Sequence, residues 1–270
     1  MIKELQKQVE QQIASIKWIQ QPTGLYEPIE YVLSLGGKRI RPVLTLLACR
    51  LFSGDEKAAM PAALAIEVFH NFTLLHDDVM DRADTRRGKA TVHKKWNDNT
   101  AILSGDAMLI LAYKFMCAPT TEHIAKALDT FTEATLGVCE GQQYDTDFES
   151  RNDVKEEEYM EMIRLKTSLL LACSMKIGAQ LAGASDEDAQ NLYDFGEKMG
   201  LAFQLQDDLL DVYEETKTPI MMLENCCYGR FEMMTPCSSA PMPFGIPSPR
   251  IHSVISLQTM SISSVTPASS

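Results

Sequence analysis

The sequence predicts an all-α protein, and three observations support this fold class. Apolar residues recur every three or four positions in residues 42–52, 62–78, 101–116, 122–142, 159–183 and 189–215. No segment shows sustained alternation of apolar and polar residues, so strands are not expected. The composition, 45% hydrophobic and 23% charged, is ordinary for a globular protein, and 270 residues are enough to bury a sizeable core.

Start and break signals separate these segments in chain order. The motif "GGKRIRP" precedes the first segment, and breaks fall at "SGDEK", "CAPTT" and "AGASD". Capping boxes are predicted at 153–156 ("DVKE"), before the fifth segment, and at 185–188 ("SDED"), before the sixth.

The helical pattern ends near residue 216. Residues 217–270 hold seven of the twelve prolines and only five charged side chains, without helical periodicity. Such a segment lacks both the pattern of a core and the charge that solvates a disordered chain. We therefore expect a helical domain over 1–216 and an irregular, disordered tail over 217–270.

Charge and composition exclude several classes of function. The formal net charge of −12 argues against nucleic acid as a partner, because phosphates require a basic surface. The polar start "MIKELQKQVEQQ" lacks the apolar stretch of a signal peptide, and no apolar run has the length of a membrane span. Seven scattered cysteines without a CxxC pair are typical of a reducing compartment. We expect a cytoplasmic protein without stable membrane insertion.

Two aspartate clusters carry the strongest chemical signal. Asp77, Asp78 and Asp81 end one apolar segment, and the same spacing returns later in "FQLQDDLLD". Positions i and i+4 share a helix face, so the outer aspartates of each cluster point the same way. Two such clusters facing each other would repel, and Mg²⁺ would resolve the conflict because it prefers oxygen ligands and shares them with phosphate.

Other interpretations of these carboxylates remain open at this point. A single DDxxD motif is as readily a solvated helix end. The stretch "EVFH", residues 67–70, matches the Glu-x-x-His of di-iron bundles, but a second such pair is missing from the sequence. The HExxH motif of zinc enzymes is missing as well. The repeated spacing favours magnesium.

Basic residues accompany the first aspartate cluster. "GGKRIRP" places Lys38, Arg39 and Arg41 directly after two glycines, which allow a ligand to approach the backbone. Arg86 and Arg87 follow the aspartates. Lysine and arginine in this arrangement suit a diphosphate, although a helix start with solvated cations would look similar.

Together these motifs resemble those of the trans-isoprenyl diphosphate synthases. "GGKRIRP", "LLHDDVMDRADTRRG", "GQQYD", "KTSLL" and "FQLQDDLLD" occur in the order of that family, over roughly residues 1–216. The resemblance implies a bundle of antiparallel helices around a central cavity and a homodimer. It also implies three Mg²⁺ ions per active site.

The resemblance further implies roles for individual residues. The metal ligands would be Asp77, Asp78, Asp81, Asp207, Asp208 and Asp211. The diphosphates would be bound by Lys38, Arg41, His70, Arg86 and Arg87, with Gln142 on the cavity wall. Catalysis would depend on Lys166, Thr167 and Gln204. Phe72 and Thr73, one turn before Asp77, would limit product length, although Phe72 could equally be a core residue.

The expected reaction is a Mg²⁺-dependent condensation of isopentenyl diphosphate with an allylic diphosphate, giving a product of fifteen or twenty carbons. After "DVYEET" the family pattern, a Gly-Gly-Asp segment with further lysines, is lost. An aberrant or truncated C-terminus is therefore expected, and a weakly active or inactive homologue is an alternative function. A terpene cyclase-like enzyme is another, and the basic "GGKRIRP" motif and the second aspartate cluster argue against it.

Overall fold

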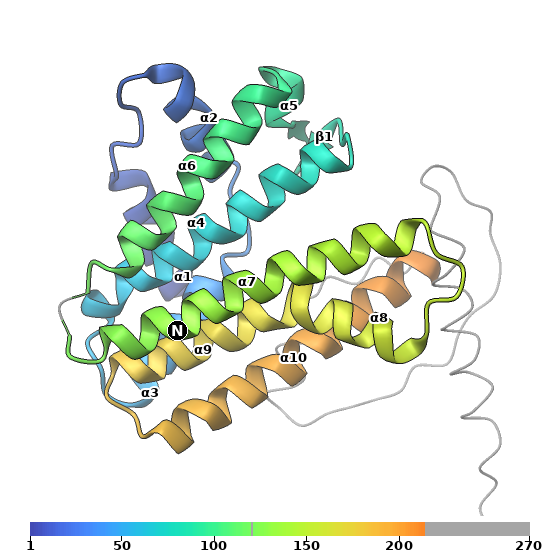
Figure 1. Ribbon diagram of the computed structural model, residues 1–270. Coiled ribbons are helices and arrows are strands. Elements are labelled where there is room, and N and C mark those ends of the chain that lie inside the picture. The colour runs from blue at the N-terminus through green and yellow to red at the C-terminus, as the bar shows by residue number, and fades with distance from the viewer. Residues whose placement is uncertain (120, 214–270) are drawn as a thin grey trace, which may run out of the picture. The chain divides into compact units, whose positions relative to one another are not determined.

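A computed structural model describes residues 1–119 and 121–213, with side chains described up to residue 210 apart from residue 120. The described elements are α1 (Ile2–Ser15), α2 (Thr23–Ser34), α3 (Ile40–Leu51), α4 (Glu56–Met80), β1 (Thr85–Arg86), β2 (Lys89–Ala90), α5 (Val92–Lys95), α6 (Asp98–Met116), α7 (Ile124–Glu149), α8 (Glu156–Ile163), the π-helix η1 (Arg164–Ser168), α9 (Leu169–Leu181) and α10 (Asp186–Tyr213) (Figure 1). The all-α prediction is confirmed. The tail expected at 217–270 lies outside the described residues.

The chain divides into two compact units. Unit 1 comprises Met1–Gly137 and Leu169–Glu197. Unit 2 comprises Val138–Ser168 and the described residues from Lys198 onward. The first aspartate cluster belongs to unit 1 and the second to unit 2, so each is described within its own unit.

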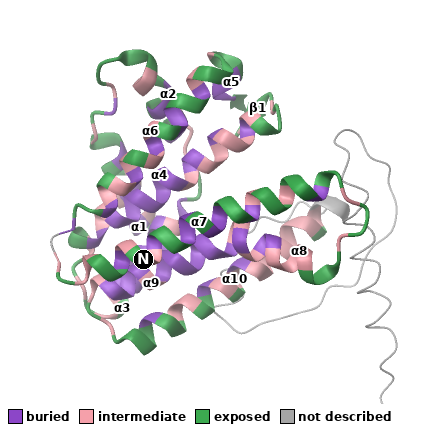
Figure 2. Cartoon of the chain, in the orientation of Figure 1, coloured by how far each residue is buried: buried purple, intermediate pink, exposed green. Residues whose placement is uncertain are grey.

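The core of unit 1 is built by two helix pairs, α4 with α6 and α3 with α9. Helix α4 is buried along most of its length, as the purple ribbon in Figure 2 shows, and Phe69 is fully inaccessible. Met108 of α6 is also fully inaccessible. Gly178 of α9 lies so close to α3 that an added Cβ would be 2.1 Å from the carbonyl oxygen of Thr45. Small residues at this crossing allow close packing of the two helices.

The core of unit 2 is smaller. Phe148 of α7 packs with Met162 and Ile163 of α8, and Leu201 and Leu205 of α10 cover them. This cluster fixes α8 against α10, the helix that carries the second aspartate motif.

Two elements precede the first helix expected from the sequence. In α1, Leu5, Val9 and Ile13 are buried at four-residue spacing. In α2, the buried positions include Ile29 and Leu33. The signal in α1 is a narrow apolar stripe in an otherwise polar segment, which explains why a search for strongly apolar runs passes over it.

The expectation of no strands is wrong at one place. Strands β1 and β2 form an antiparallel hairpin in which Thr85 lies opposite Ala90. Arg87 and Gly88 connect them with φ values of 52° and 72°. Positive φ at both loop residues is typical of a tight two-residue hairpin turn. Strands of two residues are too short to show alternation, so periodicity could not reveal them.

One of the two predicted capping boxes is confirmed. The Ser185 hydroxyl accepts a hydrogen bond from the Asp188 amide at 3.1 Å, at the start of α10. The other box is displaced, because the amide of Lys155 donates to the Glu158 carboxylate at 3.1 Å. The sequence prediction for α8 placed this arrangement two residues too early.

Helix α4 has the length and apolar composition of a membrane span. Within the described residues it is the single helix that meets both criteria, and 67% of its most apolar window is buried inside the protein. Such burial is typical of the core helix of a water-soluble fold, so the observation is weak support for a membrane span.

Candidate active site

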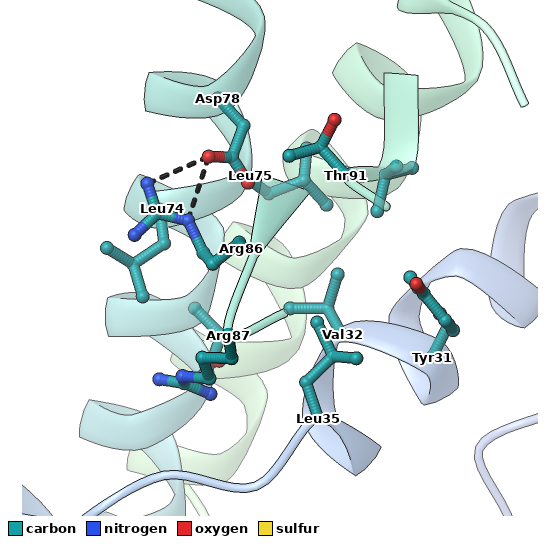
Figure 3. A pocket seen from close by; sticks show the side chains of 11 residues that line it. Tyr31, Val32, Leu35, Leu74, Leu75, Asp78, Arg86, Arg87 and Thr91 are labelled. Atoms are coloured by element: carbon teal, nitrogen blue, oxygen red, sulfur yellow. Dashed lines mark hydrogen bonds and ion pairs between the residues drawn. The ribbon is translucent and has the colours of Figure 1, made fainter. Parts of the chain in front are cut away.

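The first aspartate cluster lies at the C-terminal end of α4. Asp78 is buried, and its Oδ1 accepts a hydrogen bond from Arg86 Nε at 2.8 Å. The same oxygen forms an ion pair with Arg86 Nη2, also at 2.8 Å, as Figure 3 shows. Burial raises the pKa of Asp78, and the Arg86 guanidinium opposes that rise. Asp77 is half-buried and Asp81 is exposed. The middle aspartate of the motif is therefore tied to the β1–β2 hairpin.

The hairpin is itself fixed to α2. The Tyr31 hydroxyl donates to the carbonyl oxygen of Ala90 at 2.7 Å. On the same side, Lys95 lies 3.8 Å from the centre of the Tyr31 ring. These contacts hold Arg86 and Arg87 in place beside α4.

The Asp78–Arg86 pair borders a pocket formed by α2, α4 and residues 86–92 (Figure 3). Its lining residues are Tyr31, Val32, Leu35, Asn71, Leu74, Leu75, Asp78, Arg86, Arg87, Thr91 and Val92. Apolar side chains of α2 and α4 thus lie beside the ion pair, whose aspartate is buried while its arginine stays partly exposed.

The glycines of "GGKRIRP" allow close contact with Arg87. Gly36 and Gly37 have φ values of 73° and 148°, which side chains with a Cβ rarely adopt. Arg87 Nη1 donates to the carbonyl oxygen of Gly36. A Cβ at Gly37 would lie 3.0 Å from the guanidinium carbon of Arg87. The motif and the hairpin, 51 residues apart, form one basic surface, on which Lys38 is exposed.

Arg41 and His70 form a contacting pair in unit 1. Arg41 Nη1 lies 3.2 Å from His70 Nε2. Burial lowers the pKa of Arg41 to about 10. The pKa of His70 falls well below its usual value, first through burial and then through the charges of Arg41, Arg87 and Arg86. His70 is therefore neutral at pH 7, with Nε2 accepting from Arg41, and the group as a whole favours an anion.

Arg39 belongs to the same motif but has a different environment. Its side chain is buried and contacts three helices: Nε donates to Glu10 at 2.8 Å, Nη1 to Glu67 at 2.6 Å, and Nη2 to the carbonyl of Leu33 at 2.7 Å. Glu67 also accepts from Asn71 at 2.9 Å. Both residues of the Glu-x-x-His stretch thus contact arginines, Glu67 with Arg39 and His70 with Arg41. These contacts account for the stretch without a di-iron site.

The two residues expected to limit product length lie side by side on α4. Phe72 is buried, with its ring 4.7 Å from that of His76 and 5.5 Å from that of Phe69. The Thr73 hydroxyl donates to the carbonyl oxygen of His70 at 2.9 Å. Phe72 is therefore part of an aromatic cluster in the core of unit 1, and its role in product length stays a prediction.

The second aspartate motif lies on α10 in unit 2. Asp207 is half-buried, whereas the side chain of Asp211 lies outside the described residues. Asp208 accepts two hydrogen bonds, from Gln204 Nε2 at 2.9 Å and from the hydroxyl of Tyr159. As in the first motif, protein groups hold the middle aspartate. Tyr159, 49 residues away in the sequence, was not expected at this site.

The π-helix η1 presents Lys166 and Thr167 in unit 2. Lys166 Nζ donates to Asp145 at 2.6 Å, and the Thr167 hydroxyl donates to Gln204 Oε1 at 3.0 Å. Short π-helical segments often mark functional sites. Gln142, also expected here, is half-buried on α7.

Two glycines make room for η1. A Cβ at Gly141 of α7 would lie 2.4 Å from the backbone nitrogen of Lys166, and a Cβ at Gly200 of α10 would lie 2.6 Å from the Cα of Ser168. Contacts this short do not occur between real atoms, so both positions require glycine. The sequence signal for the first of these positions is the glycine that begins the motif "GQQYD", Gly141.

The carboxylates fit magnesium by their chemistry. Asp77 and Asp81 lie one helical turn apart, and oxygen ligands of this kind are those that Mg²⁺ prefers. Among the residues that the structure describes, no three histidine, cysteine, aspartate or glutamate side chains already form a metal-binding group. The carboxylate oxygens are therefore of the type that suits Mg²⁺, and they would arrange around the ion when it binds.

Comparison with known proteins identifies the family. The sequence profile of polyprenyl synthetases matches residues 22–219. A geranylgeranyl diphosphate synthase of Methanosarcina mazei is 42% identical over 213 residues, which cover 78% of this chain and 66% of that protein. The chain therefore spans just under two thirds of the length of this curated relative.

Solved structures agree with this result. A crystal structure of a geranylgeranyl pyrophosphate synthase matches with a TM-score of 0.77 and 48% identity, over 81% of this chain and 67% of the other. A polyprenyl synthase of Caulobacter crescentus, complexed with calcium and isoprenyl diphosphate, matches with a TM-score of 0.70 and 32% identity, over 78% and 65% of the two chains. On this sequence match and this shared helical fold, the chain belongs to the polyprenyl synthetase family.

Proposed function

We propose that this chain is a prenyltransferase that joins isopentenyl diphosphate to an allylic diphosphate, giving a product of fifteen or twenty carbons. The observation that carries the proposal is the basic surface of unit 1. The charges of Arg41, Arg87 and Arg86 act on a neutral His70, two turns before the aspartates that end α4, and Lys38 is exposed in the same motif as Arg41. A net acidic protein that concentrates cations in this way is suited to an anionic substrate.

In this proposal, isopentenyl diphosphate binds to Lys38, Arg41, His70 and Arg87. The left-handed Gly36 and Gly37 leave the backbone open to the substrate, and the arginines supply paired N–H donors to its phosphate oxygens. Partial burial of Arg41 strengthens this attraction because water screens it less.

The aspartates and Arg86 serve the allylic diphosphate. Asp77 and Asp81 of the first motif, and Asp207 and Asp211 of the second, would hold Mg²⁺, with three ions per active site as the family resemblance implies. Bound magnesium would neutralise the diphosphate as negative charge builds up on it. Arg86, already aimed at Asp78, would add a direct contact to the same group.

Lys166, Thr167 and Gln204 are assigned to the allylic carbon. The oxygens of Thr167 and Gln204 present partial negative charge, and Lys166 would bind the departing diphosphate. Loss of the diphosphate leaves an allylic cation, which the double bond of isopentenyl diphosphate attacks to form the new carbon–carbon bond. The second cation that results loses a proton to the departed diphosphate, which restores a double bond. Gln142 would complete the wall that keeps water away from this cation.

An inactive or weakly active homologue is the second candidate, and one observation favours it. After "DVYEET" the sequence lacks the Gly-Gly-Asp segment with further lysines that the family resemblance implies, and those lysines would have bound diphosphate.

The test is an assay with Mg²⁺, isopentenyl diphosphate and a set of allylic primers of five, ten and fifteen carbons. We expect a Mg²⁺-dependent product that Asp77→Ala abolishes and that the exposed-site control Asp129→Ala leaves unchanged. Product formation without divalent metal would contradict the metal assignment. A complete lack of product would contradict catalysis and favour the second candidate.

Product length is tested in the same assay with Phe72→Ala. If the aromatic ring limits the growing chain, its removal shifts the product to longer chains. An unchanged product length would assign Phe72 to the core alone.

A further inference from the structure

Four side chains of unit 2 form one continuous hydrogen-bonded chain. The Thr167 hydroxyl donates to Gln204 Oε1 at 3.0 Å, and Gln204 Nε2 donates to Asp208 Oδ1 at 2.9 Å. The Tyr159 hydroxyl donates to the other oxygen, Asp208 Oδ2. The chain thus connects the π-helix η1, the helix α10 and the helix α8.

The direction of the Gln204 amide follows from this chain. An amide has one donor end and one acceptor end, whereas an ionised carboxylate only accepts. Asp208 therefore fixes the nitrogen of Gln204 on its own side, and the carbonyl oxygen must face Thr167. A reversed amide would place two acceptor oxygens against each other.

Tyr159 is well suited to hold Asp208. It packs against the cluster of Phe148, Met162 and Ile163, which fixes its ring on α8. A phenol is protonated at neutral pH, so its hydroxyl can donate to the carboxylate.

We propose that Tyr159 is a positioning residue of the active site: its hydroxyl fixes the Asp208 carboxylate, which orients the Gln204 amide and, through it, Thr167. The proposal rests on the proposed function, because that function assigns Gln204 and Thr167 to catalysis. Tyr159 would act on them through Asp208. It also assigns Asp208 to orientation within the protein, whereas its neighbour Asp207 keeps the proposed metal role.

One experiment reads the amide of Gln204 directly, without substrate or metal. Protein labelled with ¹⁵N-glutamine is compared by NMR, and Gln204→Glu identifies the Gln204 side-chain signal. We expect Tyr159→Phe, which removes a single hydroxyl, to shift this signal, and Thr167→Val to shift it from the other end of the chain. Tyr26→Phe, which removes a phenolic hydroxyl from α2, should leave it in place. A signal unmoved by Tyr159→Phe would overturn the proposal.

The second experiment measures kinetics. Tyr159→Phe should lower kcat about tenfold, the size expected for the loss of one hydrogen bond to a charged group, and leave KM for isopentenyl diphosphate unchanged. Because both residues act through one chain, the double variant with Thr167→Val should lose no more than the more severe single variant. Additive losses would contradict the coupling. An inactive chain would contradict only the proposed function, since the amide signal still decides the role of Tyr159.

Discussion

Lys38 and Arg39 are neighbours in the sequence with opposite environments. Lys38 is exposed on the basic surface, whereas Arg39 is 3% exposed and bonded to Glu10, Glu67 and the carbonyl of Leu33. The left-handed backbone of Arg39, with φ of 47°, turns its side chain inward at the start of α3. One cation is thus available to a ligand, and the other joins α1, α2 and α4.

This difference predicts unequal effects on stability. Arg39→Met leaves the buried Glu67 without its cation, and we expect the free energy of unfolding to fall by about 3–5 kcal/mol. Lys38→Met, the adjacent control, should change it by less than ~0.5 kcal/mol. Urea denaturation measures both. Equal effects of the two variants would contradict the structural role of Arg39.

His70 predicts a dependence of stability on pH. Burial and nearby arginines hold its pKa well below the usual 6.5, so the unfolded chain binds a proton near pH 6.5 while the folded chain does not. The contribution of His70 to the free energy of unfolding should therefore be constant above that pH. Below it, the free energy of unfolding should fall by at most ~1.4 kcal/mol per pH unit.

Comparison with His70→Gln isolates this contribution, because the remaining histidines and carboxylates titrate in both proteins. Unfolding by urea is measured at several pH values between 7 and about 5.5, above the usual range of aspartate and glutamate. Identical slopes in the two proteins would contradict a depressed pKa at His70.

At the scale of elements, contact between helices depends on individual glycines. The α3–α9 crossing brings Gly178 next to the Thr45 carbonyl oxygen, 2.1 Å from the place of an added Cβ. The obstacle is backbone and cannot move aside as a flexible side chain would. By contrast, Gly24 of α2 has nothing within 4 Å of the same position.

Gly178→Ala should therefore destabilise the protein by about 1–3 kcal/mol, because it forces the two helices apart. Gly24→Ala is the matched control and should keep or raise stability, since alanine favours helix by up to ~1 kcal/mol over glycine. Thermal unfolding compares the two. A neutral Gly178→Ala would show that the crossing has room to spare.

The sequence was informative about elements with many local signals. The apolar period located the helices α4, α6, α7, α9 and α10. The repeated DDxxD spacing marked the end of α4 and identified the aspartate motif of α10. The hairpin and η1 were not predicted, because each differs from its surroundings over only a few residues. The partners of Arg39 and Asp208 were not predicted for another reason. Glu67 and Tyr159 lie 28 and 49 residues away from them, and only the folded chain brings such residues together.

At the scale of the whole molecule, the division at residue 216 stays a prediction. If residues 1–216 form the folding domain, a chain ending at Thr216 should unfold cooperatively at the same temperature as the full chain. Circular dichroism on heating measures this. Loss of the cooperative transition would show that residues 217–270 contribute to the fold.

Assembly into a homodimer is also a prediction for the whole molecule. Helix α6 exposes Leu103 and Ile110, 60% and 68% accessible and seven residues apart, so both lie on one face. We expect a second copy to cover this face and sedimentation to report twice the chain mass. Leu103→Glu with Ile110→Glu should give monomers, whereas glutamate at exposed Leu51 should not. A monomeric parent chain would contradict the prediction.

The π-helix η1 has a consequence for changes in chain length. A π-turn accommodates one residue more than an α-turn, so deletion of a single residue between 164 and 168 would let the helix return to regular α-helical hydrogen bonding. Because the wide turn takes up the extra residue, its loss would leave the helix faces before and after it roughly in phase. The change would fall on the turn itself, where Lys166 and Thr167 would move relative to their partners Asp145 and Gln204. A shortened chain of this kind would have a more regular backbone and a disconnected site, so the extra residue is a feature that selection for stability alone would remove.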